Sequence, residues 1–286
     1  MKSSRRVALA VLSMALAFLL SAGGAGAAAA WVSLEAGLET AEFDLPADEE
    51  DSADERTVAV LRIDPEKFDF LLCAASLDGR GARTLDAWGE EYALSAAINA
   101  SMYLPDGSTS TGYMREGRHV NNGRIAKRFG AFFVAGPDDA SLPAAGILDR
   151  DTPGWEEKLA HYRLVIRNDR MIDAERRLLW AEGGPMYAIS AVAQAGDGRI
   201  LFIHCRRPVE ARRFARDLLE LPLDVRTVMY VEGGAQAGML IRSATLRRTI
   251  TGAPDIPFLI TGRLSAPLPN VLGVRAKSVP AGGTTP

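Results

Sequence analysis

The sequence predicts a single-domain α+β protein, built on a mixed or antiparallel sheet with a few flanking helices. Short apolar runs of strand length outnumber the helical patterns along the chain of 286 residues. The helical patterns do not alternate regularly with the strands, as they would in a doubly wound fold. No long repeat or shift in composition marks a boundary, so we expect one domain at residues 31–277.

Residues 1–30 have the organisation of a secretory signal peptide. Arg5 and Arg6 form a basic head, residues 7–20 are apolar, and residues 21–30 are small and end in an Ala-x-Ala pattern before Trp31. The apolar run is shorter than the roughly 20 residues that a membrane-spanning helix needs. We therefore expect cleavage near Trp31, export to the periplasm or the extracellular space, and no stable membrane insertion afterwards.

In the first half of the domain most of the expected elements are short buried strands. In order they are a hairpin of residues 57–64 and 67–74 around an Asp-Pro turn, a helix at 85–92, a strand at 94–99, a hairpin of 112–114 with 118–120, a strand at 129–135 and a long connection at 137–153.

The second half contains the clearest hairpin and the strongest helix. Residues 162–166 and 170–172 flank an Asn-Asp turn, residues 188–194 and 200–205 form the hairpin, residues 211–221 form the helix, and residues 225–231 form a buried strand. Phe214, Leu218 and Leu221 share one face of that helix. The Pro, Gly and Thr content of residues 278–286 predicts a disordered tail.

Composition excludes several classes of function. A formal net charge of −3 argues against a protein that binds nucleic acid by neutralising phosphates. The three histidines share no metal-ligand spacing, so we expect no metal site, and no sequence signature identifies a cofactor. Cys73 and Cys205 both lie in apolar runs, and the sequence leaves open whether they form a disulfide or stay as buried thiols.

Functional side chains follow two of the predicted strands. Asn99 ends the strand at 94–99, with Tyr103 in the loop beyond it, and Glu232 with Gly233 and Gly234 ends the strand at 225–231. Glycine at a strand end lets the backbone turn sharply and approach a ligand. We expect the two strands to lie in one sheet with their loops on one side.

Glu232 is the strongest catalytic candidate. Its strand would half-bury the carboxyl and raise its pKa towards a value useful for proton transfer. The alternative is that the side chain accepts hydrogen bonds from turn amides and only ties the loop. Asn99 could likewise bind a sugar hydroxyl or a phosphate oxygen, or instead satisfy its own turn.

Arg206 and Arg207 directly follow the predicted strand at 200–205. An arginine at this point suits phosphate, because its planar fork of donors matches the phosphate oxygens. The alternative is a solvated pair beside the arginine-rich helix.

At these same segments the sequence resembles the phosphodiester glycosidase family, whose domain is shared with the enzyme that uncovers mannose 6-phosphate. The resemblance rests on Ile-Asn-Ala-Ser-Met-Tyr at 98–103, Tyr-Arg-Leu-Val-Ile-Arg-Asn-Asp-Arg at 162–170 and Met-Tyr-Val-Glu-Gly-Gly-Ala-Gln-Ala at 229–237. It is most similar to a bacterial, exported branch with Glu-Gly-Gly. Asn99, Glu232, Gly233 and Gly234 fall on the family's site.

The resemblance implies hydrolysis of a sugar-1-phosphodiester, giving a free sugar and a phosphomonoester. Two positions depart from the family pattern, which has Asp where this chain has Glu232, and a Pro-Arg-Thr segment where this chain has Pro-Met-Tyr at 185–187. Arg206 or Arg207 is the candidate to replace the missing arginine. The alternative function is a non-catalytic envelope module that binds sugar phosphates or glycans.

Overall fold

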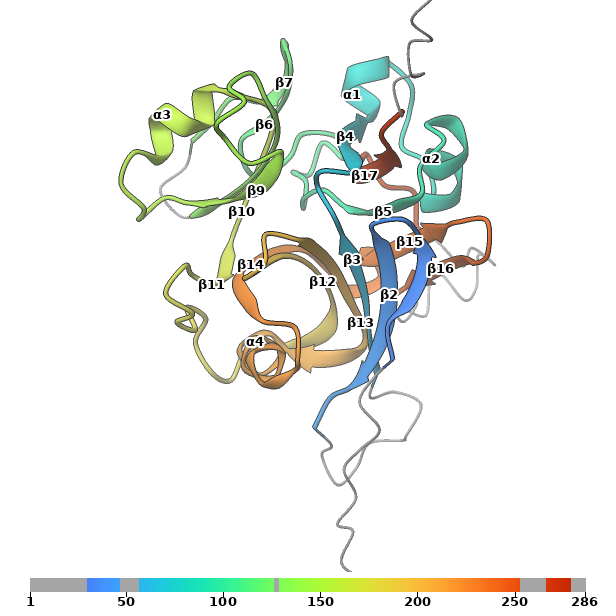
Figure 1. The fold of residues 1–286 in the computed structure, drawn as a ribbon, viewed down its shortest axis with the longest axis vertical. Coiled ribbons are helices and arrows are strands. Elements are labelled where there is room, and N and C mark those ends of the chain that lie inside the picture. Colours follow the sequence, from blue (N-terminus) through green and yellow to red (C-terminus); the bar gives the residue numbers. More distant parts are fainter. Residues whose placement is uncertain (1–29, 47–56, 126–128, 253–265, 279–286) are drawn as a thin grey trace, which may run out of the picture. The chain divides into compact units, whose positions relative to one another are not determined.

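The computed structural model of the chain describes residues 30–46, 57–125, 129–252 and 266–278. The expected signal peptide and nearly all of the expected tail lie outside these residues. The residues from Trp31 onward belong to one compact unit. That unit is a single α+β domain of three antiparallel sheets with a few short helices, so the predicted fold class is confirmed (Figure 1).

The largest sheet has seven strands, and one of them carries Glu232. In spatial order its strands are β1 (Val32–Glu35), β2 (Leu38–Asp44), β3 (Thr57–Ile63), β13 (Ile200–Glu210), β12 (Met186–Ala195), β14 (Val225–Gly233) and β11 (Arg170–Ile172). We call it the large sheet. The hairpin expected at residues 188–194 and 200–205 is its β12–β13 pair and is confirmed.

Two five-stranded sheets complete the domain. The β10 sheet runs β7 (His119–Asn122), β6 (Met114–Glu116), β10 (Tyr162–Asn168), β8 (Ala131–Pro137) and β9 (Ala145–Asp149). The β5 sheet runs β16 (Arg247–Thr251), β15 (Gly238–Arg242), β5 (Ala96–Asn99), β17 (Asn270–Ala276) and β4 (Phe68–Ala74).

The helices are short and pack against the sheets (Figure 1). They are α1 (Ala75–Asp78), α2 (Leu85–Glu91), α3 (Trp155–Ala160) and α4 (Ala211–Glu220). The Glu210 side chain caps α4 by accepting hydrogen bonds from the backbone N–H groups of Arg212 and Arg213, which satisfies two of the amides that a helix start leaves unpaired. Phe214 and Leu218 are buried on its inner face, as the sequence predicts.

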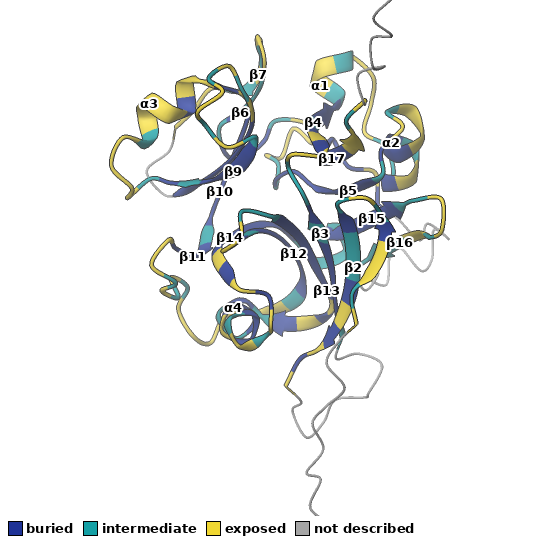
Figure 2. Cartoon of the chain, in the orientation of Figure 1, coloured by how far each residue is buried: buried dark blue, intermediate teal, exposed yellow. Residues whose placement is uncertain are grey.

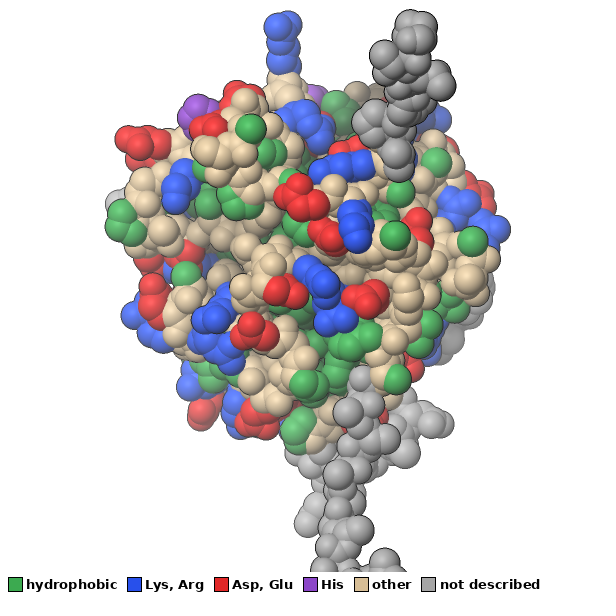
Figure 3. All heavy atoms as spheres, viewed as in Figure 1, with side chains coloured by type: hydrophobic (Ala, Val, Ile, Leu, Met, Phe, Trp, Pro, Cys, Tyr) green, Lys and Arg blue, Asp and Glu red, His purple; other side chains and the backbone are tan. Residues whose placement is uncertain are grey.

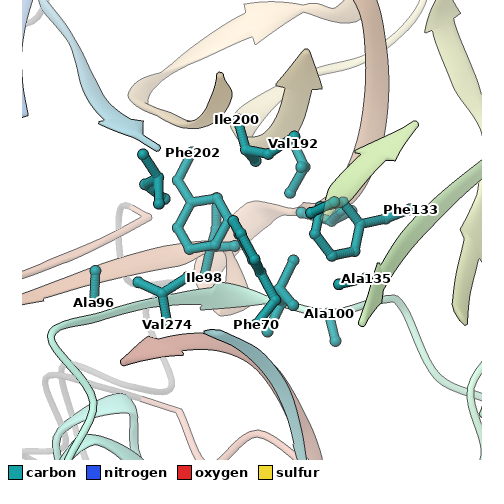
Figure 4. Close-up of a cluster of buried hydrophobic side chains, with 14 of the residues drawn as sticks. Phe70, Ala96, Ile98, Ala100, Phe133, Ala135, Val192, Ile200, Phe202 and Val274 are labelled. Carbon is teal, nitrogen blue, oxygen red and sulfur yellow. The ribbon is translucent and has the colours of Figure 1, made fainter. Parts of the chain in front are cut away.

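All three sheets contribute side chains to one core (Figure 2). At its centre Phe70 from β4 lies 5.2 Å from Phe133 of β8 and 6.3 Å from Phe202 of β13, measured between ring centroids (Figure 4). Each of these rings comes from a different sheet, so Phe70 joins the three sheets in a single packed cluster.

The structure corrects three local expectations. The β3 and β4 strands do not pair as a hairpin, because β3 lies between β2 and β13 while β4 pairs with β17. Residues 162–166 and 170–172 likewise belong to different sheets, as parts of β10 and β11. The connection expected at 137–153 contains the strand β9. This strand pairs with β8, and local composition does not predict that pairing.

The surface carries both signs of charge. Lys and Arg side chains are interspersed with Asp and Glu over the face shown in Figure 3. Most of the charged side chains that form ion pairs are at least partly exposed, as in the pairs of Arg80 with Glu91 and of Arg248 with Glu42. No helix within the described ranges is long and apolar enough to cross a membrane.

We expect Phe70→Ala to lower the free energy of unfolding by about 3–5 kcal/mol, because it removes a buried ring at the junction of all three sheets. Urea unfolding followed by tryptophan fluorescence measures the change. Val120→Ala is the matched control, since Val120 is 48% exposed and its loss should cost less than about 0.5 kcal/mol. Equal effects of the two substitutions would show that Phe70 contributes no more to the free energy of unfolding than an exposed residue does.

Candidate active site

Glu232 lies at the end of β14, where a β-bulge changes the direction of the strand. The pairing with β12 passes from Tyr230 opposite Ala191 to Glu232 opposite Ser190, so Val231 is an extra residue in β14. A bulge of this kind re-aims the side chains beyond it. Because residues directly opposite each other share a face of the sheet, Glu232 lies on the face of Ser190 and Tyr230 on the other face.

The environment of Glu232 favours its protonated form. The side chain is only 6% exposed. Burial raises the pKa of the carboxyl to about 7, and a hydrogen bond from the Gly233 backbone N–H to Oε1, 2.9 Å long, opposes this only in part. No charge on a described Lys or Arg contributes to the shift. Glu232 therefore titrates near neutral pH, where it can exchange a proton with a substrate or a water.

Asn99 holds the backbone that follows Glu232. Its side-chain Nδ2–H donates to the carbonyl of Gln236 at 2.9 Å, and its Oδ1 accepts from the N–H of Gly238 at 2.8 Å. Asn99 is buried and ends β5, whereas Glu232 ends β14, so the two strands lie in different sheets and not in one as expected. The chain crosses from the large sheet to the β5 sheet between Glu232 and Gly238, and Asn99 clamps that crossing.

Tyr103 is the third residue of this group. It is half-buried, and both burial and the negative charge of Glu232 raise the pKa of its phenol, while a hydrogen bond with the Gln236 side chain lowers it. The structure thus brings Asn99, Tyr103 and Glu232 together around Gln236, a residue that the sequence analysis did not single out.

Packing requires glycine at position 233, and backbone conformation favours it at position 234. A Cβ atom on Gly233 would lie 2.2 Å from the Tyr230 hydroxyl oxygen and 2.9 Å from Cδ2 of Tyr187. Gly234 has a φ of +70°, a conformation that side chains other than hydrogen disfavour. Tyr187 and Tyr230 were not predicted as site residues: Tyr230 lies in the apolar run at 225–231, and Tyr187 directly precedes the run at 188–194.

Arg206 and Arg207 lie in β13, which β12 separates from β14. They form part of an irregularity in the β12–β13 pairing, which shifts between Tyr187 and Ile189. Arg206 is exposed, and its charge lowers the pKa of the neighbouring His204. Arg207 is buried. The structure therefore brings Asn99, Tyr103 and Glu232 together as one group. The two arginines lie on β13, with β12 between them and the strand of Glu232.

The two cysteines do not form a disulfide with each other. Cys73 and Cys205 are free thiols in different sheets, and burial raises the pKa of each to about 12, which makes them unreactive near neutral pH. Among the described residues no cluster of His, Cys, Asp or Glu is placed to hold a metal ion.

A family model for phosphodiester glycosidases matches residues 92–275, which include every candidate site residue named above. The chain belongs to the phosphodiester glycosidase family. No curated protein matches the sequence significantly. The assignment therefore rests on the family match, and the similar solved structures agree with it in fold.

Solved structures that resemble this member of the phosphodiester glycosidase family include the following two. The zebrafish N-acetylglucosamine-1-phosphodiester alpha-N-acetylglucosaminidase catalytic domain, auto-inhibited by its pro-peptide, superposes with a TM-score of 0.56 and 13% identity over 87% of both chains. A hypothetical protein from Synechocystis gives a TM-score of 0.55 and 12% identity over 87% of this chain. This chain spans only 64% of the Synechocystis protein. At such identities the likeness concerns the fold alone.

We expect Glu232→Gln to stabilise the protein at alkaline pH relative to the wild type. The folded-state pKa of about 7 lies above the ordinary glutamate value of 4.5, which applies to the unfolded chain, so only the folded state keeps the proton between these two pH values. The stability that Glu232 contributes is present below pH 4.5 and is lost as the pH rises through 7. Gln does not titrate, so the variant lacks this loss, which amounts to at most about 3 kcal/mol.

Urea unfolding of both proteins at a series of pH values from 4 to 9 measures the difference. Glu66→Gln, at an exposed turn position, is the matched control and should follow the wild type at every pH. Parallel curves for the wild type and Glu232→Gln would show that Glu232 has an ordinary pKa.

Proposed function

We propose that this chain is an exported glycosidase that hydrolyses a sugar-1-phosphodiester to a free sugar and a phosphomonoester. The single observation that carries the proposal is the buried Glu232, with a pKa of about 7, at the end of β14 in a phosphodiester glycosidase domain. A carboxyl that titrates near neutral pH is matched to proton transfer under physiological conditions.

In the proposed reaction a water molecule attacks the anomeric carbon of the sugar. The bond between that carbon and the phosphate oxygen breaks, and its electron pair leaves with the phosphate. Because the phosphomonoester leaves as a stable anion, it needs little help from an acid. Removing a proton from the attacking water is the step that gains most from a protein group, so ionised Glu232 acts as the general base.

The neighbouring residues support this role in different ways. Asn99 positions the backbone beyond Glu232 through its bonds to Gln236 and Gly238. The half-exposed Tyr103 offers a hydroxyl beside Glu232 that can bind the sugar. Gly233 and Gly234 keep the adjoining backbone free of side chains that would obstruct the substrate.

Arg206 is the residue of the pair that we assign to the phosphate. Arg206 is exposed, whereas Arg207 is buried. The charge of Arg206 also lowers the pKa of His204, which lies two residues earlier on the same strand, β13. A guanidinium can bind two phosphate oxygens at once. It would take over the part that the family's Pro-Arg-Thr segment plays, which this chain lacks.

Export is the cellular part of the proposal. The basic head, apolar run and small residues before Trp31 support a cleaved signal peptide, and the substrate would then be a phosphodiester of the cell envelope. N-terminal sequencing of the protein from the envelope fraction should begin near Trp31, and an intact Met1 would contradict it.

The second candidate is a non-catalytic envelope module that binds sugar phosphates or glycans. One observation favours it: Glu232 and Asn99 both make hydrogen bonds to the backbone of the crossing between β14 and β15. In such a module these contacts would be the whole purpose of the two side chains. Glu232→Gln would then retain ligand binding, and no hydrolysis would be measurable in the wild type.

For the catalytic role we expect Glu232→Gln to lower kcat by about 100- to 10,000-fold, the usual loss when a general base is removed. The assay uses aryl and sugar-1-phosphodiesters with the mature protein. The wild-type kcat should rise with pH through an apparent pKa near 7, because the base must be ionised. Full activity of the variant would exclude Glu232 as the base, and a kcat that falls through pH 7 would make it an acid.

For the phosphate contact we expect Arg206→Ala to raise KM for a phosphodiester by about tenfold or more, since one charge-assisted hydrogen bond contributes about 1.5–3 kcal/mol. Arg216→Ala, which removes an exposed arginine from α4, is the control and should leave KM unchanged. An unchanged KM in Arg206→Ala would remove Arg206 from the proposed site.

A further inference from the structure

A buried serine–histidine pair joins β12 to β13, and its serine is the residue of β12 that pairs with Glu232. Ser190 Oγ is 3.0 Å from Nδ1 of His204, and both residues are at most 1% exposed. The two are directly opposite each other in the β12–β13 pairing, and Ser190 is also directly opposite Glu232 in the β12–β14 pairing. No residue of this pair has a role in the proposed reaction.

The pair is connected to the loop that follows Glu232. Ser190 Oγ also lies 3.4 Å from the carbonyl oxygen of Gly238, the residue whose N–H donates to Asn99 Oδ1 at 2.8 Å. Gly238 is thus held on one side by Asn99 from the β5 sheet and on the other by Ser190 from the large sheet. Glu232 and Gly238 are the two ends of the crossing between these sheets.

The backbone around the crossing is packed without spare room. A Cβ atom on Gly252 would lie 2.0 Å from the carbonyl oxygen of Gly234, and the Gly252 N–H donates to the Ala237 carbonyl at 2.7 Å. His204 interacts with the backbone of Thr251, the last residue of β16 and the neighbour of Gly252 in the chain. A buried polar group is costly unless it is hydrogen-bonded, so a serine–histidine pair at this depth restricts the crossing to one arrangement.

We propose that Ser190 and His204 are positioning residues that hold the crossing at residues 233–238 closed over Glu232 and so keep its carboxyl out of water. The inference rests on the proposed function only in that Glu232 is the site it serves. Loss of either side chain would loosen Gly238, admit water beside Glu232 and favour the ionised carboxylate.

His204 performs this role as a neutral ring. Burial and, to a smaller extent, the charge of Arg206 lower its pKa to about 4 against the opposing effect of the Thr251 backbone. Arg206 is the one charged side chain, among the residues that the structure describes, that contributes to this shift. A neutral imidazole keeps one N–H donor, and Nδ1–H can therefore donate to the Ser190 hydroxyl oxygen over the whole range in which Glu232 titrates, which leaves the Ser190 O–H to donate to the Gly238 carbonyl.

The test is the pKa of Glu232, measured by carbon-13 NMR of its carboxyl in the full-length mature protein. We expect His204→Leu, which keeps the volume but removes both ring nitrogens, to lower that pKa by about one unit or more towards 4.5. His204→Asn, which retains a polar atom near the Nδ1 position, should restore a value close to that of the wild type.

Ser190→Ala removes a single oxygen and provides a second variant if His204→Leu fails to fold. It should lower the Glu232 pKa in the same direction and speed amide hydrogen exchange at Gly238. Thr40→Val is the matched control, because it removes a hydroxyl that donates to the Val60 carbonyl in the same sheet, far from the crossing. It should lower stability by a similar amount and leave the Glu232 pKa unchanged.

The result that overturns the inference is a folded His204→Leu or Ser190→Ala whose Glu232 still titrates at about 7. The titration needs no substrate, so it remains decisive if no phosphodiester is hydrolysed. If hydrolysis is found, the pH dependence of kcat should shift by the same amount as the pKa in each variant, which a loss of stability alone would not produce.

Discussion

The packing of Phe70 against two other aromatic rings is the contact on which the rest of the domain depends. Phe70, Phe133 and Phe202 come from the β5 sheet, the β10 sheet and the large sheet, and their burial removes a large apolar area from water at one point (Figure 4). Each sheet turns one face to this core, and α2 and α3 cover apolar residues on the other face of the β5 sheet and of the β10 sheet. Each is held by the other two, and the positions of the strand ends follow from that arrangement.

The candidate site lies where the chain passes between sheets. Between Glu232 and Gly238 it crosses from the large sheet to the β5 sheet, and at Asn168 it passes from the β10 sheet towards β11. Two buried asparagines secure these passages. Asn99 bonds to Gln236 and Gly238, and Asn168 donates to the carbonyl of Ala100 at 2.9 Å. Because backbone amides and carbonyls at such passages cannot join a sheet ladder, side-chain amides are needed to satisfy them.

The chemistry of Glu232 follows from the same geometry. A carboxyl at a strand end that opened to solvent would be ionised and would have little use as a proton carrier at neutral pH. Here the carboxyl is buried, Tyr103 lies close enough to interact with its charge, and the single amide that bonds to Oε1 offsets only part of the burial. The fold therefore accepts a loss of stability above neutral pH in exchange for a group that titrates where a hydrolase works.

What the sequence determined by itself was the set of elements. The strand runs at 129–135, 188–194 and 225–231 and the helix at 211–221 are all present, because apolar periodicity and turn residues act over a few neighbouring positions. It also located Glu232, Asn99 and Tyr103, since polar side chains at the ends of apolar strands stand out locally. Only the tertiary structure decided that β3 and β4 do not pair and that Asn99 and Glu232 belong to different sheets. It also decided that Ser190 pairs with Glu232 on one side and with His204 on the other. Those facts depend on contacts between residues far apart in the chain, and on burial, neither of which any local pattern records.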